Sequence, residues 1–476
     1  MYLRSGHSAG VVRGCHSTSR LTGRTKRLIG STPAPVAGWR ARRPPAHASA
    51  LATAAALPVL LLNTTHVPLL GTAGDVEVRP TDLVIAAVLV ISAVSAVRRR
   101  RLKAALPWLW LAPFLAYLLL SAAMADGDGA LVGGAKLLEW LLYGVAVTLS
   151  AQTRADLRIL LEGVGWSALF FGAIGGVEAL THLGRADSLL GANALGLLGA
   201  VALALALGSR DLETGRGLRL PLTVGGALCL IASASVGAAV AALAVVLATG
   251  WLRARNGWRP GVRTLALAAT LAAVGLVAVA ALRFEDIDAA LGSSSQPPAE
   301  STARGETGGS FRQRLMYADF GVRIWLDEPF LGVGFLQSVE ASSWLPHLPD
   351  VRADFPRLRG DYFPPAPGTP FKEMETPTFG LHTVYLQVLA ELGLLGFFLL
   401  LAGLGGLAHN AWRHADRSAQ PVLVLPLVAI FVGFVEHQLF GGVPDATLLA
   451  FALGLAAVGN RGRSVEAEPR AGDQRP

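Results

Sequence analysis

Charged residues are scarce in this chain, because Asp, Glu, Lys and Arg together make up only 16% of its 476 residues. Soluble proteins carry roughly 25%. Hydrophobic residues reach 52%, a share that excludes a soluble domain of this length. The composition therefore predicts an integral membrane protein.

Cysteine is also scarce, with two residues in the whole sequence, Cys15 and Cys229. Their spacing fits neither a disulfide framework nor a cysteine-based metal site. Interleaved basic and aromatic residues are missing as well, so we expect no nucleic acid partner. A Gly-rich dinucleotide fingerprint is absent, and a soluble nucleotide-sugar site is therefore not predicted.

Residues 1–45 are rich in Arg, Lys, Pro, Ser and Gly and show no apolar period. This composition is typical of disorder, and we interpret the segment as a disordered basic cytoplasmic tail. It is too long and too basic for a usual signal peptide, and it has no clear small-residue cleavage site. A misassigned start codon is the alternative interpretation.

Apolar runs long enough to cross a bilayer recur along the rest of the chain. A span needs roughly 20 residues with few charges, and by this measure the sequence predicts about twelve transmembrane helices. The runs lie at 48–64, 81–97, 104–124, 131–150, 158–180, 193–208, 218–232, 235–252, 262–282, 380–407, 421–440 and 444–459. The predicted fold class is an all-α integral membrane protein.

The charge of the connections predicts the orientation of these helices. With a cytoplasmic N-terminus, every second connection is Arg-rich and the short connections on the other side carry almost no Lys or Arg, as the positive-inside rule requires. The pattern thus predicts that both termini are cytoplasmic. The Arg-rich stretches are 98–101, 151–158, 208–219, 251–263, 409–417 and 460–463.

One predicted external connection is far longer than the others, and long loops cross the membrane regardless of charge. It divides the chain into parts, with about nine helices before the loop and about three after it. The predicted domains are the tail 1–45, the N-terminal transmembrane bundle 46–282, the large external loop 283–380, the C-terminal transmembrane helices 381–460 and the tail 461–476.

The second half of this loop has the pattern of an amphipathic helix. Met316, Phe320 and Ile324 recur at helical spacing, so we expect an apolar stripe that lies at the outer membrane interface. Pro329 and the glycines at 332–334 end the segment. The polar side chains are Arg312, Asp319 and Arg323 on a neighbouring stripe, and Arg314 on another.

Three patterns follow one another here: an arginine-bearing segment, then W-x3-P-x2-G-x-G, then H-x3-L-x4-E-x-G-x2-G at the start of a late helix. Their residues are Arg314, Trp325, Pro329, Gly332, Gly334, His382, Leu386, Glu391, Gly393 and Gly396. With the run GANALG around Asn193 and the large late external loop, the chain resembles the O-antigen ligase and O-antigen polymerase superfamily.

The resemblance implies an inverting, metal-independent glycosyltransferase without a cofactor. Such an enzyme transfers a glycan from an undecaprenyl diphosphate carrier to an acceptor hydroxyl at the outer face of the bacterial inner membrane. The implied partners are the lipid-linked glycan donor, a glycan, lipid or protein acceptor, membrane lipid, and polysaccharide-assembly proteins.

The chemistry of the residues agrees with this expectation. Arginine neutralises a diphosphate through bidentate and permanently charged donors, and histidine suits a general base near neutral pH. His382 is therefore the predicted catalytic residue. The predicted substrate-binding residues are Arg312, Arg314, Arg323 and Glu391.

Each candidate also has a structural interpretation. His382 can cap the helix at its start or extend its side chain toward the membrane surface. The arginines can contact anionic lipid headgroups, and Asp319 can pair with a neighbouring arginine. A carboxylate as deep in its helix as Glu391 needs a polar cavity or a partner. We interpret the Lys136–Glu139 pair as mutual neutralisation, and Trp325, Pro329 and the glycines as shaping the loop.

One position departs from the family pattern. The external turn that carries a Ser-Arg-Gly run in the superfamily reads Ser235-Val236-Gly237 here. The missing arginine leaves the first contact with the carrier unassigned, or marks a divergent or inactive member. The candidates for that contact are Arg185, Arg283 and Arg323.

Ligase and polymerase activity are not separable from these residues, because both use the same donor chemistry. A twelve-helix transporter or lipid-glycan flippase is the second hypothesis, which predicts an internal repeat and broken helices with polar residues at the bilayer midplane. No repeat is visible in the sequence. A non-catalytic assembly scaffold is the third hypothesis.

Overall fold

The structure, a computed structural model, describes residues 47–63, 67, 69–73, 76–125, 128–182, 186, 188–209, 216–255, 307–355, 381, 383–414, 419–434 and 443–458. Contacts between residues separate the segment before His47 from the unit His47–Pro476. All the described residues belong to this unit. The predicted tails 1–45 and 461–476, the span 262–282 and His382 lie outside the described residues.

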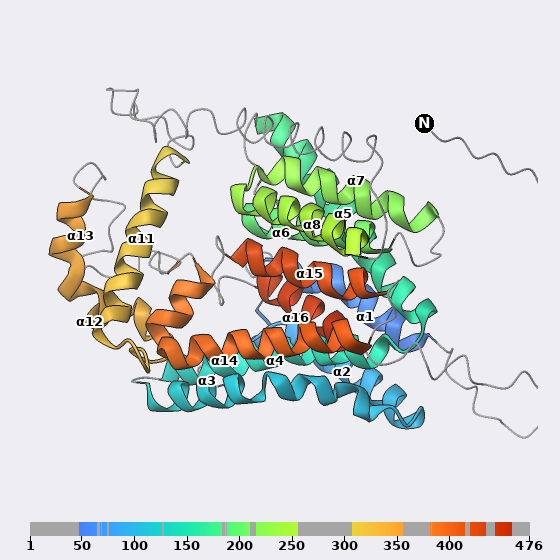
Figure 1. The fold of residues 1–476 in the computed structure, drawn as a ribbon, viewed down its shortest axis with the longest axis horizontal. Coiled ribbons are helices and arrows are strands. Elements are labelled where there is room, and N and C mark those ends of the chain that lie inside the picture. The colour runs from blue at the N-terminus through green and yellow to red at the C-terminus, as the bar shows by residue number, and fades with distance from the viewer. Residues whose placement is uncertain are drawn as a thin grey trace, which may run out of the picture. The chain divides into compact units, whose positions relative to one another are not determined.

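The unit His47–Pro476 is built from helices (Figure 1). The long ones are α1 (Ala48–Leu60), α2 (Pro80–Arg98), α3 (Ala112–Met124), α4 (Asp128–Ser150), α5 (Arg154–His182), α6 (Ala192–Gly208), α7 (Arg216–Ser233), α8 (Val236–Arg255), α11 (Thr307–Asp327), α14 (Val384–His414), α15 (Gln420–Gly433) and α16 (Val443–Ala457). The short ones are the 3₁₀ helices η2 (Leu102–Trp110), η4 (Gln337–Val339) and η5 (Leu345–His347), and the α-helices α12 (Ala341–Trp344) and α13 (Leu348–Asp354).

A small antiparallel pair interrupts the helices between α1 and α2. Strands β1 (Gly71–Ala73) and β2 (Val76–Val78) place Thr72 opposite Glu77. Because each strand has three residues, the pair is a connection and not a layer of the fold. The described elements are otherwise helical, in agreement with the predicted fold class.

The described helices outside residues 307–355 coincide with the predicted apolar runs. Five are long and apolar enough to cross a membrane, and η2 with α3 adds a sixth span if this pair, bent by 65°, is counted as one. The remaining apolar helices are shorter. The helices indicate a multi-pass membrane protein, whereas the count of about twelve spans and the orientation stay predictions. The five are α2, α4, α5, α8 and α14.

Small residues let the helices approach one another closely. An added Cβ at Gly454 of α16 would lie 2.5 Å from the carbonyl oxygen of Gly144 in α4. The Thr148 hydroxyl donates to the Gly454 carbonyl at 2.9 Å. Lipid tails are as apolar as leucine, so van der Waals contact and interhelical hydrogen bonds of this kind hold membrane helices together.

The pairing predicted on α4 is present. The Lys136 ammonium lies 3.1 Å from the Glu139 carboxylate, and Asp82 of α2 adds a second carboxylate at 2.8 Å. Lys136 therefore also ties α2 to α4.

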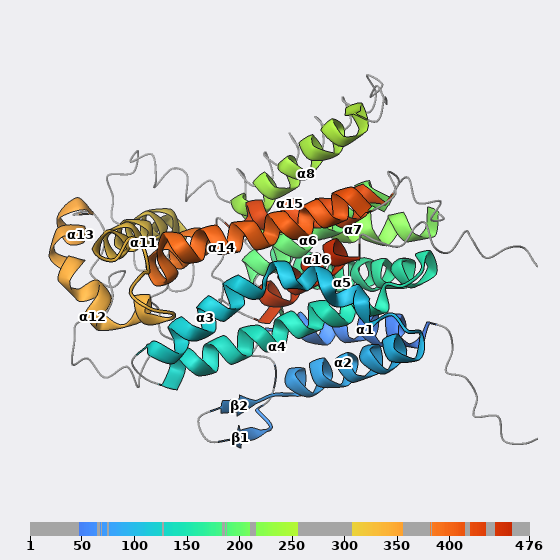
Figure 2. The same cartoon turned by 60° about the horizontal axis from the view of Figure 1, so that its bottom comes forward.

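A second and smaller hydrophobic core lies beside the N-terminal part of α14, where α11, α12 and α13 gather (Figure 2). Met316, Phe320 and Ile324 of α11 are all fully buried in it. The predicted apolar stripe is therefore present, but its expected place at the membrane interface is wrong, because the stripe packs against other parts of the protein. Their partners are Tyr317, Trp344, Leu348, Val351, Leu381 and Ala390. This core joins the described part of the predicted loop to the start of α14.

Candidate functional site

The helix α14 is broken at Gly393, where φ is 62° and ψ is −168°. The sequence pattern predicted a continuous helix here, so the break is a correction. That backbone conformation is essentially restricted to glycine. A break leaves the last carbonyl groups of the first half and the first N–H groups of the second half without helical partners.

The segment Pro329–Gly334 supplies those missing partners. The N–H groups of Val333 and Gly334 donate to the carbonyls of Ala390 and Glu391 at 2.9 and 3.0 Å. In return, the N–H groups of Leu394 and Leu395 donate to the carbonyls of Pro329 and Phe330 at 2.9 and 3.2 Å. The two family motifs are thus backbone partners, and the 329–334 segment completes both ends of the broken helix.

Glycine is required on both sides of this junction. Gly332 has φ 74° and Gly334 has φ 112°, both in the left-handed region that favours glycine. A Cβ on Gly332 would collide with the backbone of Glu391, and one on Gly393 would collide with the backbone of Phe330. The Trp325 indole N–H donates to the Pro329 carbonyl at 3.1 Å. These contacts agree with the predicted loop-shaping role.

The Glu391 carboxylate is enclosed beside the break, with only 1% of the residue exposed. Its Oε1 accepts hydrogen bonds from the Ser338 hydroxyl at 2.6 Å and from the Gln387 amide at 3.2 Å. A buried carboxylate is stable only with such donors. These two contacts support the structural interpretation of Glu391, and its role in substrate binding stays a prediction.

Helix α3 fixes the far side of the segment. The Tyr117 hydroxyl donates to the Leu331 carbonyl at 2.9 Å, and the Phe335 N–H donates to the Ser121 hydroxyl at 3.0 Å. The sequence patterns did not indicate these two contacts from α3 or the contact from Ser338. Gln387 could have been found, because residues four apart share one face of a helix.

Leu381 and Thr383 flank His382 in the chain, and both are described. Leu381 is buried in the second core, and a Cβ on Gly321 of α11 would touch its side chain at 3.1 Å. The carbonyl of Thr383 accepts the first helical hydrogen bond of α14, from the N–H of Gln387 at 2.9 Å. Leu381 therefore lies next to α11, and the predicted catalytic residue His382 is itself outside the described residues.

The three predicted arginines have different surroundings on α11. Arg323 donates to Asp319 at 3.0 Å and to Asp354 at 2.6 Å, with Asp350 at 3.5 Å. The hydrogen bond to Asp319 raises the pKa of the Arg323 guanidinium, and the pairing expected for Asp319 is confirmed. Arg314 is half-buried two turns before Gly321, and the side chain of Arg312 is outside the description.

The departure from Ser-Arg-Gly lies at the turn between α7 and α8. Val236 begins α8 and is exposed. The turn packs against α6, because a Cβ on Gly196 would lie 2.8 Å from the Ser233 hydroxyl and 3.0 Å from the Ser235 Cβ. This brings the turn beside the GANALG run that contains Asn193. Arg185 and Arg283 lie outside the described residues.

Helix α15 contacts both α8, which follows this turn, and the start of α14. The Tyr385 hydroxyl of α14 donates to the carbonyl of Phe431, and the two rings stand 5.2 Å apart. A Cβ on Gly433 would approach Ala241 of α8 at 3.9 Å. Position 236 and the start of α14 therefore lie at the same end of the bundle.

A metal-ligand cluster of three or more His, Cys, Asp or Glu residues is not found within the described ranges. The chemistry available around the junction at Gly393 is that of arginine charge, backbone donors and the enclosed carboxylate of Glu391. This inventory suits the handling of an anionic group more than redox or hydride chemistry.

The family model described as O-antigen ligase matches residues 221–401, from α7 through the break in α14. A search of curated proteins finds no match. The match indicates a membrane glycan ligase or polymerase, a glycosyltransferase-like enzyme whose substrate is a lipid-linked glycan. The matched residues 221–401 contain all the predicted site residues, and they support a relation of this chain to the O-antigen ligase family.

Proposed function

We propose that this protein transfers a glycan from an undecaprenyl diphosphate carrier to an acceptor hydroxyl at the outer face of the bacterial inner membrane. The reaction inverts the anomeric centre and uses no metal ion. The acceptor is a growing glycan chain or a separate glycan, lipid or protein. His382 is the catalytic base, and Arg314 binds the carrier diphosphate.

The observation that supports this proposal most strongly is the junction at Gly393. Four backbone hydrogen bonds join the end of the arginine-bearing α11 segment to the helix that follows His382. In the proposal, this attachment keeps the arginine-bearing helix and the helix that follows His382 in one arrangement, which favours a fixed separation of base and diphosphate ligand. Fixed geometry is worth several kcal/mol in a two-substrate transfer.

In the proposed step, His382 takes the proton of the acceptor hydroxyl as its oxygen attacks the anomeric carbon of the donor sugar. The bond between that carbon and the diphosphate oxygen breaks, and undecaprenyl diphosphate leaves with the electron pair. The proton stays on the imidazole until solvent removes it. Arginine stabilises the charge that develops on the diphosphate.

Arg314 is the preferred diphosphate ligand among the three arginines. The charge of Arg323 is already offset by three carboxylates, so binding an anion there requires breaking those pairs. Arg312 precedes Arg314 by two residues in α11, and we assign it a supporting role. Glu391 acts on substrate only through the position of the 329–334 segment.

The test is a transfer assay with purified protein in nanodiscs and an undecaprenyl-diphosphate-linked oligosaccharide. We expect loss of product in His382→Ala and in Arg314→Gln. His409→Ala and Arg98→Gln are matched controls, because both side chains are exposed, His409 near the end of α14 and Arg98 at the end of α2, and both lie far from the 329–334 segment in sequence. A ladder of products indicates a polymerase, and a single addition to a supplied acceptor indicates a ligase.

A transporter predicts broken helices, and α14 is broken. However, the backbone groups freed at the break are hydrogen-bonded to the 329–334 segment instead of lining a cavity. The same nanodiscs separate the two functions. Wild-type protein that moves the lipid-linked glycan across the bilayer and forms no new glycosidic bond would refute the transferase and support a flippase.

A further inference from the structure

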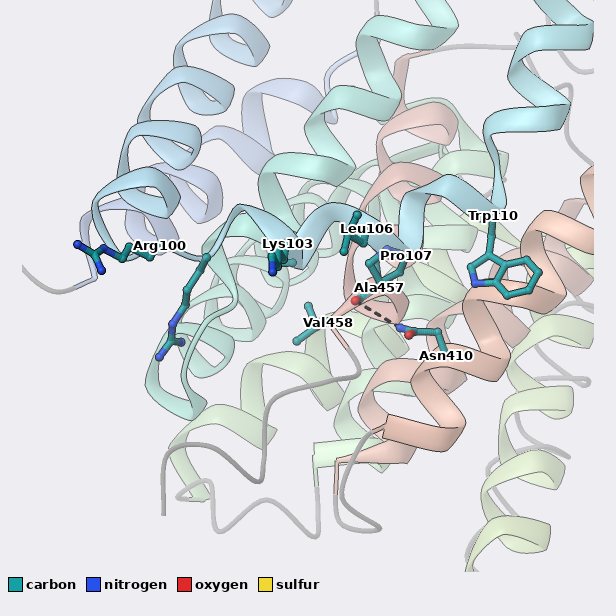
Figure 3. A pocket seen from close by; sticks show the side chains of 10 residues that line it. Arg100, Lys103, Leu106, Pro107, Trp110, Asn410, Ala457 and Val458 are labelled. Atoms are coloured by element: carbon teal, nitrogen blue, oxygen red, sulfur yellow. Dashed lines mark hydrogen bonds between the residues drawn. The ribbon is translucent and has the colours of Figure 1, made fainter. Parts of the chain in front are cut away.

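A cavity of about 470 Å³ opens near the C-terminal end of α14, where Asn410 forms part of its wall (Figure 3). Along the helix axis, Asn410 lies about 26 Å beyond Gly393, at 1.5 Å per residue. The hydrocarbon core of a bilayer is about 30 Å thick. The cavity and the junction at Gly393 therefore lie near opposite surfaces of the membrane.

The walls of the cavity are graded from cationic to apolar. In Figure 3, Arg100 lies at one end and Trp110 at the other, with Lys103, Leu106 and Pro107 between them. None of the described residues that line it is acidic. The full lining is Arg100, Arg101, Lys103, Ala104, Leu106, Pro107, Trp110, Asn410, Ala457 and Val458. This arrangement suits an amphiphile with an anionic head.

The cationic end has charge that the described residues do not neutralise. Arg101 is held in place because its guanidinium donates to the Gln152 carbonyl at 3.1 Å. Arg100 and Lys103 form no ion pair or hydrogen bond with side chains of other described residues. The backbone of Arg100 has φ 54°, a conformation that is uncommon for a residue with a Cβ. Two cations are thus available to a ligand.

The apolar end is exposed in the manner of an interfacial segment. Leu106 and Trp110 of η2 are each more than half exposed, as are Leu102 and Leu109. Helix η2 turns by 65° into α3, so it does not simply extend that helix. Exposed apolar side chains on a bent end segment, with a tryptophan, are typical of the membrane–water boundary.

The floor of the cavity does not repel an anion strongly. The last carbonyl groups of α16 point toward Asn410, and a helix C-terminus is negative. The Asn410 amide donates to the carbonyls of Ala456 and Ala457 at 3.4 Å each. These bonds partly satisfy the carbonyl oxygens at the end of α16 and so offset part of its negative charge.

From these features, we propose that the cavity binds the phosphate headgroup of an anionic phospholipid. The phosphate sits against Arg100 and Lys103, and an acyl chain lies along Leu106 and Trp110. The predicted orientation places this end in the cytoplasmic leaflet, which carries the anionic lipids. A soluble phosphate compound offers the same anionic group without the chain, and it does not use the apolar end.

The test is native mass spectrometry of the full-length protein with phosphatidylglycerol added against a background of phosphatidylcholine. We expect the double variant Arg100→Gln/Lys103→Gln to bind several-fold less phosphatidylglycerol than wild type. The matched control is Arg98→Gln/Arg413→Gln, which removes the same charge from exposed residues that do not line the cavity. The control should bind as wild type does.

A second variant, Leu106→Glu, keeps both cations and places a carboxylate in the cavity at an exposed position. It should also lose phosphatidylglycerol, and unchanged elution in size-exclusion chromatography shows that either variant is folded. Equal binding by the cavity variants and wild type would overturn the proposal, as would equal losses in the cavity variant and the control. Displacement of the lipid by millimolar inorganic phosphate would also overturn it, in favour of a soluble ligand.

Discussion

The two halves of α14 are held by different means. Before Gly393, the helix depends on hydrogen bonds from the 329–334 segment, and its one buried carboxylate has two side-chain donors. After Gly393, small residues let apolar side chains pack closely, as where Gly406 meets the Trp110 ring. The residues around Gly393 thus need specific partners, whereas the later turns of α14 depend mainly on close packing, to which Asn410 adds two long hydrogen bonds with α16.

This difference separates the part of the helix suited to chemistry from the part suited to lipid. Polar contacts fix positions and are costly to disturb, because a lost partner leaves a buried group unsatisfied. Van der Waals packing tolerates small changes as long as volume is kept. Variants on the two sides of Gly393 should therefore differ in kind, and the following changes test that expectation.

The largest effect is expected for Gly393→Ala. The new Cβ meets the backbone of Phe330, and the φ and ψ angles there are disallowed for alanine. Strain of this sort costs about 1–3 kcal/mol, and the collision adds about 1–3 kcal/mol. Thermal unfolding in detergent should show a much lower Tm, and glycan transfer should be lost.

The matched control is Gly405→Ala in the second half of the same helix. Gly405 is exposed, and an added Cβ meets nothing within 4 Å. The free energy of unfolding should change by less than about 0.5 kcal/mol. If Gly393→Ala were as stable and active as this control, the 329–334 junction would not hold α14.

The next effect concerns the partner of Glu391. Ser338→Ala removes a 2.6 Å hydrogen bond from a buried carboxylate, which costs about 1–3 kcal/mol. Ser342→Ala, on the exposed side of α12, should be neutral. Chemical unfolding of the two variants measures the difference. A Ser338 variant with wild-type stability and lower activity would assign Glu391 to substrate and not to structure.

A similar loss of stability with a different consequence is expected for Gly406→Ala. Its Cβ would lie 2.6 Å from the Trp110 Cγ, and overpacking costs about 1–3 kcal/mol. Because this contact is far from the junction, the transfer rate per folded molecule should not change. The assay compares activity with the folded fraction. A lower transfer rate with an unchanged folded fraction would contradict the difference between the two halves of α14.

Arg323→Gln should have a smaller effect. Its carboxylate partners leave the side chain 27% exposed, and exposed pairs contribute about 1 kcal/mol or less. We expect a small fall in Tm that shrinks at high salt, with KM for the donor unchanged. A large rise in KM would show that Arg323 binds the carrier diphosphate after all.

The smallest effect tests the departure in the turn before α8. Val236 is exposed at the end of the bundle where α14 begins, so Val236→Arg adds a cation without a steric cost. We expect a lower KM for the lipid-linked donor and an unchanged Tm. The control Val240→Arg, one turn further along α8 and also exposed, should leave KM as it is.

Much of the fold followed from pattern. The apolar runs placed the described helices, and the spacing of Met316, Phe320 and Ile324 placed the buried face of α11. The pair Lys136–Glu139 was visible because both residues lie on one helix face, whereas Asp82 was not, since it comes from another helix. Periodicity reports local structure, and contacts between elements need the coordinates.

The break in α14 could not be predicted for the same reason. Glycine within an apolar run reads as a packing residue, and Gly396 and Gly403 are helical in the same element. Gly393 differs because a segment distant in sequence supplies hydrogen bonds to the backbone groups that the break leaves without helical partners. The motif spacing identified both the 329–334 segment and the start of α14. Nothing in either pattern indicated that these two segments are joined by backbone hydrogen bonds.

The junction also makes amide hydrogen exchange a direct reading of how the site opens. The N–H groups of Val333, Gly334, Leu394 and Leu395 are each protected only while the segment and the helix are joined. Undocking of the segment would expose all four together as one cooperative unit. The exchange rate of these amides therefore measures how often the site comes apart, without any substrate and in an otherwise folded molecule.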